Sequence, residues 1–479
     1  MAKSKKSHFD MMNTVAILGL GFVGTAMAAA VSLAKGDDGA NLYRIVGIDQ
    51  DNCDGLEKIR KINSGVSPIV SEDKSLDDAI LKANSSGLLT ATTDLDSLNA
   101  ADIVIVDINL DVKNLYSQNS TNYVLEENRF IEAIESIALR IMPTTLVLIE
   151  TTVPPGFTEK KILPLFQKVF EQRNIDIGQI RLAHSYERVT PGRNYLGSII
   201  NQHRVYSGIN YRSAELARDF LESIINTELY PLTQLQTPTS SEIAKVLENS
   251  YRAANIAFIK EWTEFAEVAG VNLFEILDAI RQRSTHNNIM NPGFGVGGYC
   301  LTKDGILADW GAKELFSFDL SMDCSVRAIQ INNSMPQYAF NLMQKHSSKI
   351  NKKKVVLFGL SYIEDVSDTR SSASIEFLRL CGETVADISV HDPYVKSCPE
   401  LNIEVTKTID HLPGDLNIIV FAVKHSEYRN HDPLDLIAKF KDLVLVVDGN
   451  DVLSDDQASI YRSSGVTVVG VGKGHWTNN

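Results

Sequence analysis

The sequence is short of cysteine, tryptophan and positive charge. Its 479 residues include five cysteines and three tryptophans, and 46 lysines and arginines stand against 60 aspartates and glutamates. The formal net charge of −14 at pH 7 argues against a nucleic-acid partner or an acidic membrane surface, since both attract basic proteins. Any anionic ligand must therefore be held by local basic residues.

The cysteine pattern excludes further classes of site. The cysteines are odd in number, and no pair has the close spacing of a metal or redox motif, so we expect no bound metal. The sequence also lacks an apolar run long enough to span a bilayer, and the basic segment Met1–His8 has no apolar signal-peptide core. We expect a cytoplasmic protein with reduced thiols, no membrane partner and a mobile tail over the first dozen residues. The cysteines are Cys53, Cys300, Cys324, Cys381 and Cys398.

One of these cysteines follows a glycine-rich loop. The segment Gly295–Asp304 reads Gly-Val-Gly-Gly-Tyr-Cys-Leu-Thr-Lys-Asp, which places Cys300 close to a cation and a carboxylate. A thiol with its usual pKa of about 8.5 is mostly protonated at neutral pH, so a nearby positive charge would make it a better nucleophile. The structural alternative is that Cys300 is a small buried hydrophobic residue, because free cysteine is often buried.

A second motif lies near the start of the chain. The apolar run Thr14–Leu18 leads into Gly-Leu-Gly-Phe-Val-Gly at residues 19–24 and then into an alanine-rich helical segment. This order of strand, tight turn and helix is typical of dinucleotide binding, because the glycines let backbone amides approach a pyrophosphate. The alternative is an ordinary strand-to-helix turn. The expected cofactor-binding residues are Gly19, Gly21, Phe22, Val23, Gly24 and Asp49.

Asp49 indicates which cofactor is bound. It ends a second expected strand, Tyr43–Ile48, and lies 25 residues after Gly24, close to where such folds hydrogen-bond the adenosine ribose. A carboxylate there opposes the 2′-phosphate of NADP, and no arginine follows it to compensate. The sequence therefore predicts NAD as the cofactor.

Strand and helix patterns alternate twice along the chain, with a helical stretch between. This pattern predicts an α/β protein with two Rossmann-like parallel-sheet domains joined by a helical central domain. The expected strands are 15–18, 45–48, 103–106, 145–149 and 180–183 in the first sheet, and 354–360, 388–391, 417–422 and 443–447 in the second.

The central stretch begins with a long helix. The capping sequence Thr237–Glu242 opens a helical pattern that continues to Gly270 and suggests a spine between domains. One face carries an apolar stripe that must pack on a core or on a dimer partner. Lys245, Asn249 and Arg252 lie together on the opposite side, where the structural alternative is a solvated polar face. The stripe consists of Leu247, Tyr251, Ala254, Phe258, Trp262 and Phe265.

Taken together, these motifs resemble those of the UDP-glucose and UDP-N-acetylhexosamine 6-dehydrogenase family, from about residue 13 to 474. The resemblance rests on the order and spacing of several segments rather than on any one of them. Besides 19–24 with Asp49 and Lys245 with Asn249, the matching segments are Ile62–Ile69, Glu150–Gly156, Ser185–Val189, Gly297–Asp304 and Asp365–Arg370.

The resemblance implies a three-domain enzyme that oxidises the C6 alcohol of a UDP-sugar to the acid. The implied division is an NAD-binding domain over 13–235, a central dimerisation and catalytic domain over 236–335, and a UDP-sugar-binding domain over 336–479. The reaction is a four-electron oxidation with two NAD, in which Cys300 traps the aldehyde as a thiohemiacetal and then carries a thioester. Lys245 and Asn249 would stabilise the oxyanion.

The resemblance also assigns acid–base and substrate-binding roles. Glu187, Thr152 and Asp304 would position or activate the waters that accept the alcohol proton and hydrolyse the thioester. Arg370 would reach the substrate pyrophosphate of the neighbouring subunit in a homodimer, since a guanidinium matches phosphate oxygens. The structural alternative is an ion pair with Asp365 or Asp368. The remaining expected substrate-binding residues are Arg252, Gly297, Gly298 and Lys303.

The sequence departs from the family pattern at three positions and leaves the substrate open. Ile363 and Lys260 replace a usual lysine and asparagine, and Asp107–Leu110 replaces a small-residue, proline-containing loop. The segment Asn249–Ala257 resembles the N-acetylhexosamine branch, which we favour, whereas Gly298–Cys300 resembles some UDP-glucose 6-dehydrogenases. Two other classes remain, a two-electron NAD dehydrogenase with a structural Cys300 and a non-catalytic nucleotide-sugar-binding protein.

Overall fold

The computed structural model describes residues 12–113, 123–190, 192–319, 321–382, 384–398 and 400–477. The predicted N-terminal tail lies almost entirely outside these residues. The chain forms two compact units, and each is described by itself. The first contains residues up to Lys113, Tyr123–Leu247 and Leu307–Ser321, and the second contains Glu248–Ile306 and the residues from Met322 onward.

The first unit is built on an eight-stranded sheet in the order β10-β9-β8-β7-β4-β1-β2-β3. All neighbouring strands are parallel except β8 and β9. The carboxyl ends of β1, β2, β3, β4, β7 and β8 therefore meet along one edge, and β9 and β10 run in the opposite direction. The strands are β1 (Asn13–Leu18), β2 (Tyr43–Ile48), β3 (Leu89–Thr92), β4 (Ile103–Val106), β7 (Leu146–Ile149), β8 (Arg181–His184), β9 (Val205–Gly208) and β10 (Thr233–Gln234); β5 (Val112–Lys113) and β6 (Val124–Leu125) form a separate antiparallel pair.

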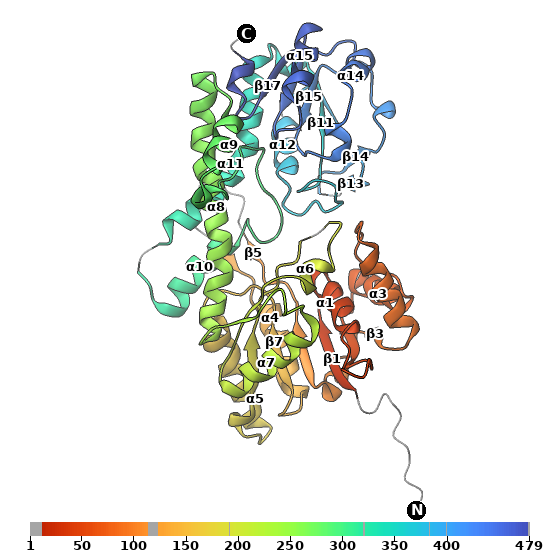
Figure 1. Cartoon of the computed structure of the whole chain (residues 1–479), viewed down its shortest axis with the longest axis vertical. Helices are drawn as coiled ribbons and strands as arrows, with labels where there is room; N and C mark the ends of the chain where they lie inside the picture. Colours follow the sequence, from red (N-terminus) through yellow and green to blue (C-terminus); the bar gives the residue numbers. More distant parts are fainter. Residues whose placement is uncertain are drawn as a thin grey trace, which may run out of the picture. The chain divides into compact units, whose positions relative to one another are not determined.

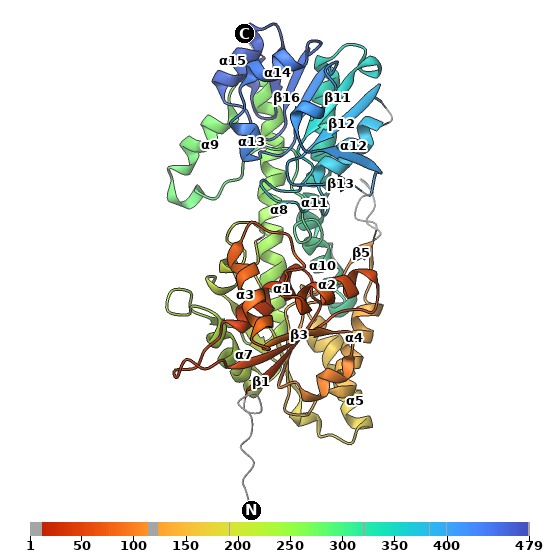
Figure 2. The ribbon, with the colours of Figure 1, turned by 90° about the vertical axis from the view of Figure 1, so that its right-hand side faces the viewer.

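Helices cover both faces of this sheet. Figure 2 shows α3 and α7 on one side of the strands and α4 and α5 on the other. The central strands β4 and β7 are apolar along their whole length because both faces of the sheet are buried there. The helices are α1 (Phe22–Ser32), α2 (Cys53–Asn63), α3 (Lys74–Ser85), α4 (Asn128–Arg140), α5 (Leu163–Gln172), α6 (Gly197–Ile200) and α7 (Tyr211–Ile224).

The second unit contains a seven-stranded sheet in the order β13-β14-β12-β11-β15-β16-β17 (Figure 1). Alternate residues of β11 enter different cores, because Val355 and Leu357 pack toward α11 and α12 whereas Val356 and Phe358 pack toward α14 and α15. The strands are β11 (Lys354–Phe358), β12 (Asp387–His391), β13 (Ser397–Cys398), β14 (Ile403–Thr406), β15 (Ile418–Phe421), β16 (Leu445–Asp448) and β17 (Thr467–Gly470), and the helices are α12 (Ala373–Gly382), α13 (Ser426–Arg429), α14 (Pro433–Lys439) and α15 (Asp455–Ser463).

Four further helices join or flank the sheets. The longest, α8, covers Pro238–Ala269 and passes from the first unit into the second. The others are α9 (Leu273–Arg281), α10 (Asp304–Trp310) and α11 (Asp323–His346). The chain returns to the first unit from Leu307, inside α10, to Ser321. There the Trp310 and Phe157 rings lie 6.2 Å apart, and a Cβ on Gly311 would lie 2.8 Å from the carbonyl of Pro155.

The structure confirms the predicted α/β fold class and all nine predicted strands, with ends shifted by no more than a few residues. The predicted helix to Gly270 is α8. The prediction omitted β3, β9 and β10 in the first sheet and β13, β14 and β17 in the second. Within the described ranges, no helix combines the length and apolar character needed to cross a bilayer.

Candidate active site

The carboxyl edge of the first sheet brings several predicted residues into one row. Leu18 pairs with both Ile48 and Val106, and Val106 pairs with Ile149. Because these strand ends are in register, the residues that follow them lie next to one another. Ligands of parallel α/β sheets bind at this edge. In spatial order, the residues that follow the strand ends are Asp49, Gly19, Asp107 and Glu150.

The glycine-rich turn has the geometry of a pyrophosphate cradle. Gly19 has a φ of +96°, and a Cβ there would lie 2.5 Å from the carbonyl oxygen of Asp107. A Cβ on Gly24 would lie 1.9 Å from the carbonyl of Gly19. A Cβ on Gly21 would meet nothing within 4 Å, so the start of α1 is open to close approach. These residues fit the phosphates of NAD, which favour helix N-termini.

Asp49 joins the end of β2 to this turn. Its Oδ2 accepts a hydrogen bond from the Leu20 amide at 2.9 Å, and its Oδ1 accepts one from the Gln50 amide at 2.8 Å. Lys58 of α2 lies 3.7 Å from the same carboxylate and also pairs with Asp54. This lysine was not predicted, because no sequence motif marks a cation at that position inside the next helix.

Thr152 and Glu187 follow neighbouring strands at equal distances. Ile149 of β7 pairs with His184 of β8, and the two predicted residues lie three positions beyond this pair. Both are buried, at 9% and 8% exposure. Lys245 of α8 is buried beside them, where its Nζ donates to the Glu187 carbonyl at 3.1 Å and lies 3.9 Å from Oε1 of that side chain. The first unit therefore groups Lys245 with Glu187.

A buried ion pair beside this group was not foreseen from the sequence. Glu150 and Arg204 are 3.0 Å apart, and their side chains are 0% and 1% exposed. Burial raises the pKa of Glu150 to about 7, although the Arg204 guanidinium opposes the shift. Asp107 interacts with both residues and with Glu187. The ion pair could not be predicted from the sequence, because Arg204 lies 54 positions from its partner and no motif links the two residues.

The second unit holds Cys300 and its loop. Cys300 is half-buried in the turn before α10, and its carbonyl accepts hydrogen bonds from the amides of Lys303 and Asp304. The amide of Gly298 donates to the carbonyl of Arg370 at 3.0 Å. A Cβ on Gly297 would lie 2.5 Å from the carbonyl of Ser371. The glycines therefore allow the segment that carries Arg370 to pack directly on the cysteine loop.

Several polar side chains surround this loop within the second unit. The Asn249 amide donates to Oδ2 of buried Asp304 at 2.6 Å. Lys303 is 2% exposed, and its ammonium lies 3.8 Å from the centre of the Tyr299 ring. Arg252 is exposed. Two of the three donors predicted on one face of α8, Lys245 and Asn249, thus bond to protein groups rather than forming a solvated face.

Tyr362 is a further member of this group that sequence analysis missed. Its ring packs on Gly298, where an added Cβ would lie 3.0 Å away. Burial, followed by the charges of Asp368 and Cys300, raises the pKa of Tyr362 to about 12, and Arg370 and Arg252 oppose the shift. Tyr362 directly precedes Ile363, one of the departures from the family pattern.

The guanidinium of Arg370 pairs with Asp368 in its own chain. Its Nε lies 3.0 Å from both carboxylate oxygens, and its Nη2 lies 2.6 Å from Oδ2. This is the ion pair that was the structural alternative to phosphate binding. The Arg370 side chain is nevertheless 40% exposed, and Asp365 instead accepts from the Ser426 amide at 3.0 Å.

Comparison with protein families shows to which family the chain belongs. Models of the three domains of the UDP-glucose/GDP-mannose dehydrogenase family match in order, the NAD binding domain over residues 13–225, the central domain over 239–334 and the UDP binding domain over 356–455. The chain belongs to this family. The family confirms the predictions of an NAD-dependent nucleotide-sugar dehydrogenase and of NAD as its cofactor.

Known relatives cover nearly the whole chain. A UDP-N-acetyl-D-mannosamine dehydrogenase of Pyrococcus horikoshii is 29% identical over 459 residues, covering 94% of this chain and 99% of the relative. An NDP-N-acetyl-D-galactosaminuronic acid dehydrogenase of Ralstonia solanacearum is 26% identical, covering 88% and 92%. The solved structure of the UDP-D-ManNAc dehydrogenase from P. horikoshii superposes with a TM-score of 0.81 at 26% identity, covering 96% and 100%.

Proposed function

We propose that the protein oxidises the C6 alcohol of a UDP-N-acetylhexosamine to the carboxylate in two successive steps. The observation that carries this proposal is the pairing of Asn249 with buried Asp304 on the segment that also holds Cys300. A hydrogen-bonded carboxylate four residues after a half-buried thiol suits acyl chemistry better than a packing role. When bound, NAD accepts one hydride in each oxidation.

The residues of the chain supply the remaining chemistry. As the alcohol is oxidised to the aldehyde, its hydroxyl proton passes to a water held by Glu187 and Thr152. The Cys300 thiol adds to the aldehyde carbon to give a thiohemiacetal, and loss of a second hydride leaves a thioester. Water then cleaves the carbon–sulfur bond, which regenerates the thiol and releases the acid. Lys245 and Asn249, one turn apart on α8, stabilise the oxyanions.

The choice of sugar rests on the relatives and on the α8 sequence. The relatives quoted above act on N-acetylated sugars by name, and Asn249–Ala257 resembles that branch. UDP-glucose is the competing substrate, since Gly298–Cys300 resembles enzymes that use it. In the same proposal, Arg370 binds the pyrophosphate, and Arg252, Lys303 and the loop glycines Gly297 and Gly298 complete the sugar-nucleotide site.

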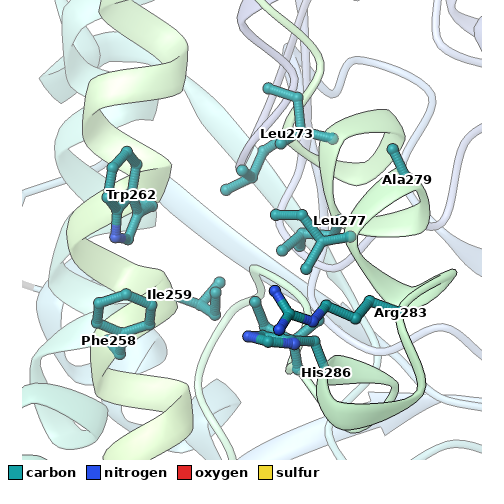
Figure 3. A pocket seen from close by; sticks show the side chains of 11 residues that line it. Phe258, Ile259, Trp262, Leu273, Leu277, Ala279, Arg283 and His286 are labelled. Carbon is teal, nitrogen blue, oxygen red and sulfur yellow. The ribbon is translucent and has the colours of Figure 1, made fainter.

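We also propose that the protein is a homodimer through α8. The aromatic side chains of the predicted apolar stripe are about half exposed among the described residues, with Tyr251, Phe258, Trp262 and Phe265 at 54%, 51%, 48% and 63%. Figure 3 shows Phe258 and Trp262 of α8 facing a groove whose other wall is Leu277 of α9. Exposed aromatic side chains of this number favour a protein contact.

The proposal includes the domain division and the compartment. The NAD-binding, central and UDP-sugar-binding domains would correspond to residues 13–235, 236–335 and 336–479. The five cysteines are all free, which fits a reducing cytoplasm.

The proposed function is tested by counting NADH against sugar. The purified protein is given limiting UDP-N-acetylmannosamine, UDP-N-acetylglucosamine, UDP-N-acetylgalactosamine or UDP-glucose with excess NAD, and absorbance at 340 nm is followed to completion. We expect two NADH for each N-acetylhexosamine consumed and little reaction with UDP-glucose. One NADH per sugar would support the two-electron dehydrogenase, whereas binding without NADH would support the non-catalytic protein.

A further inference from the structure

Asp107 occupies a central place in the row at the edge of the first sheet. It follows β4, between Gly19 after β1 and Glu150 after β7. Its amide donates to the Leu18 carbonyl at 2.8 Å. Its carbonyl oxygen lies so close to Gly19 that an added Cβ there would be 2.5 Å away. An acidic side chain is therefore fixed beside the cofactor turn, at a position where the family pattern has small residues.

The carboxyl group of Asp107 has an oxygen without a hydrogen-bond partner among the described residues. This atom, Oδ2, is also buried. The same holds for Oε2 of Glu150 and Nη1 of Arg204, both of which belong to nearly inaccessible side chains. Buried polar atoms normally find partners, so three such atoms around one group leave places for a bound proton, a water molecule or a ligand.

The charges around Asp107 do not balance when all carboxyl groups are ionised. Three carboxyl groups interact there, those of Asp107, Glu150 and Glu187. Arg204 pairs with Glu150, and Lys245 of α8 faces Glu187, so no described cation forms an ion pair with Asp107.

His184, at the end of β8, supplies no charge to this edge of the sheet, because burial, followed by the charge of Lys245, lowers its pKa to about 3. Burial, followed by the charges of Glu150 and Glu187, raises the pKa of Asp107 well above its usual value, and Arg204 opposes the shift only in part. Both effects favour the protonated form of Asp107 in the free protein.

The end of the sheet where Asp107 lies is the end where the cofactor changes charge. Asp49, after β2, is placed for the adenosine ribose, and doubly wound sheets bind the two halves of a dinucleotide on opposite sides of β1. The nicotinamide half is therefore expected beyond β4 and β7. The oxidised ring carries one positive charge that the reduced ring lacks.

We propose that Asp107 determines the preference for the oxidised cofactor by ionising only when NAD⁺ is bound. The Asp107 carboxyl group releases its proton to solvent on NAD⁺ binding, because the ring supplies the missing cation. It stays protonated when NADH binds. The consequence is that rising pH strengthens the binding of NAD⁺ but not of NADH, so the protein discriminates between substrate and product forms of its cofactor through one side chain.

Calorimetry of cofactor binding without sugar tests this inference. NAD⁺ and NADH are titrated into the full-length protein in buffers of different ionisation enthalpy, at several pH values between 6 and 8. We expect about one proton released for each NAD⁺ bound and none for NADH, with the Kd for NAD⁺ falling about tenfold per pH unit while Asp107 is protonated in the free protein. Asp107→Asn should abolish both effects.

The matched control is Asp102→Asn, at the opposite end of β4, where the carboxylate accepts from the Thr14 amide in an exposed position. This variant should release the same proton as the unmodified protein. Release of no proton by the unmodified protein, or of equal numbers with both cofactors, would overturn the inference even if Asp107→Asn does not fold. Release that persists in Asp107→Asn would assign the proton to another group.

Discussion

At the scale of single residues, the decisive question is whether Cys300 is a nucleophile. Cys300→Ser keeps the size of the side chain but offers a far poorer nucleophile, so we expect steady turnover to fall by several orders of magnitude. Binding of UDP-sugar and NAD, measured by calorimetry, should remain. A sugar ester on the introduced serine, detected by mass spectrometry, would support the covalent route. Near-normal turnover in this variant would show that Cys300 is a packing residue.

Asp49 controls the choice between the two nicotinamide cofactors. The 2′-phosphate of NADP would meet this carboxylate, which costs about 1–4 kcal/mol for charges 4 Å apart at the dielectric of a protein surface or of water. Lys58, at 3.7 Å, reduces that repulsion. We expect NAD to be preferred by about tenfold or more in kcat/KM, and Asp49→Ala to narrow the gap. Equal efficiency of the two cofactors with the unmodified protein would refute this role.

Prediction of single residues was possible where a motif fixes both residue identity and spacing. The turn at Gly19–Gly24 and the pair Lys245 and Asn249 could be read from sequence because strand and helix periodicity places them. Tyr362 and Arg204 could not, because their roles depend on partners that only the fold brings close. Asp107 was noticed only as a departure, since no local pattern shows that its carboxyl group is buried among others.

At the scale of elements, the start of α8 is held by one buried carboxyl group. Glu242 is 0% exposed and accepts from the amides of Gly156 and Thr158, at 2.6 Å and 2.9 Å. Burial raises its pKa from 4.5 to about 7, although these hydrogen bonds oppose the shift. The helix is thereby fixed to the segment that follows Thr152.

This raised pKa predicts how stability changes with pH. Because the pKa of Glu242 is higher in the folded protein than in the unfolded chain, its protonated form stabilises the folded state. This contribution to stability is complete below about pH 4.5 and is lost as the pH rises through about 7. In Glu242→Gln this pH-dependent contribution should disappear, so the thermal unfolding temperature should vary less between pH 5 and 8, as measured by scanning calorimetry. Glu264→Gln, an exposed position farther along α8, should keep the original slope. An unchanged slope in Glu242→Gln would exclude it as the titrating group.

The strands that prediction omitted also have a physical explanation. Apolar runs of four or five residues identified the central strands, which are buried on both faces. By contrast, β10 and β13 are two-residue edge strands, and β3 alternates buried with more exposed positions. Short edge strands carry too little pattern to separate them from loops.

At the scale of the whole molecule, the apolar stripe on α8 predicts self-association. Trp262→Glu should convert the dimer to a monomer, because it places a charge in the proposed interface. Leu139→Glu is the control, since Leu139 on α4 is 49% exposed and Trp262 is 48% exposed. Light scattering after size-exclusion chromatography gives the mass directly. A monomeric unmodified protein, or a dimer in both variants, would contradict the assignment.

Mixing two inactive variants tests whether Arg370 acts across the dimer. Cys300→Ser supplies an intact Arg370, and Arg370→Ala supplies an intact thiol, so co-expressed mixed dimers should regain one working site if the arginine serves the partner. Within one chain, the Arg370 carbonyl already bonds to the Gly298 amide. Mixtures that remain dimeric but recover no activity would show that Arg370 acts within its own subunit or not at all.

The discontinuous course of the chain has a consequence for how the protein is made. The first unit includes Leu307–Ser321, whose Trp310 and Gly311 pack on Phe157 and Pro155. A ribosome must therefore synthesise the intervening 248–306 before the last piece of this unit emerges. At about 5–20 residues per second, the sheet that holds Asp49 and Glu187 waits several seconds for its final covering segment. During that interval, Phe157 lacks its contact with the Trp310 ring.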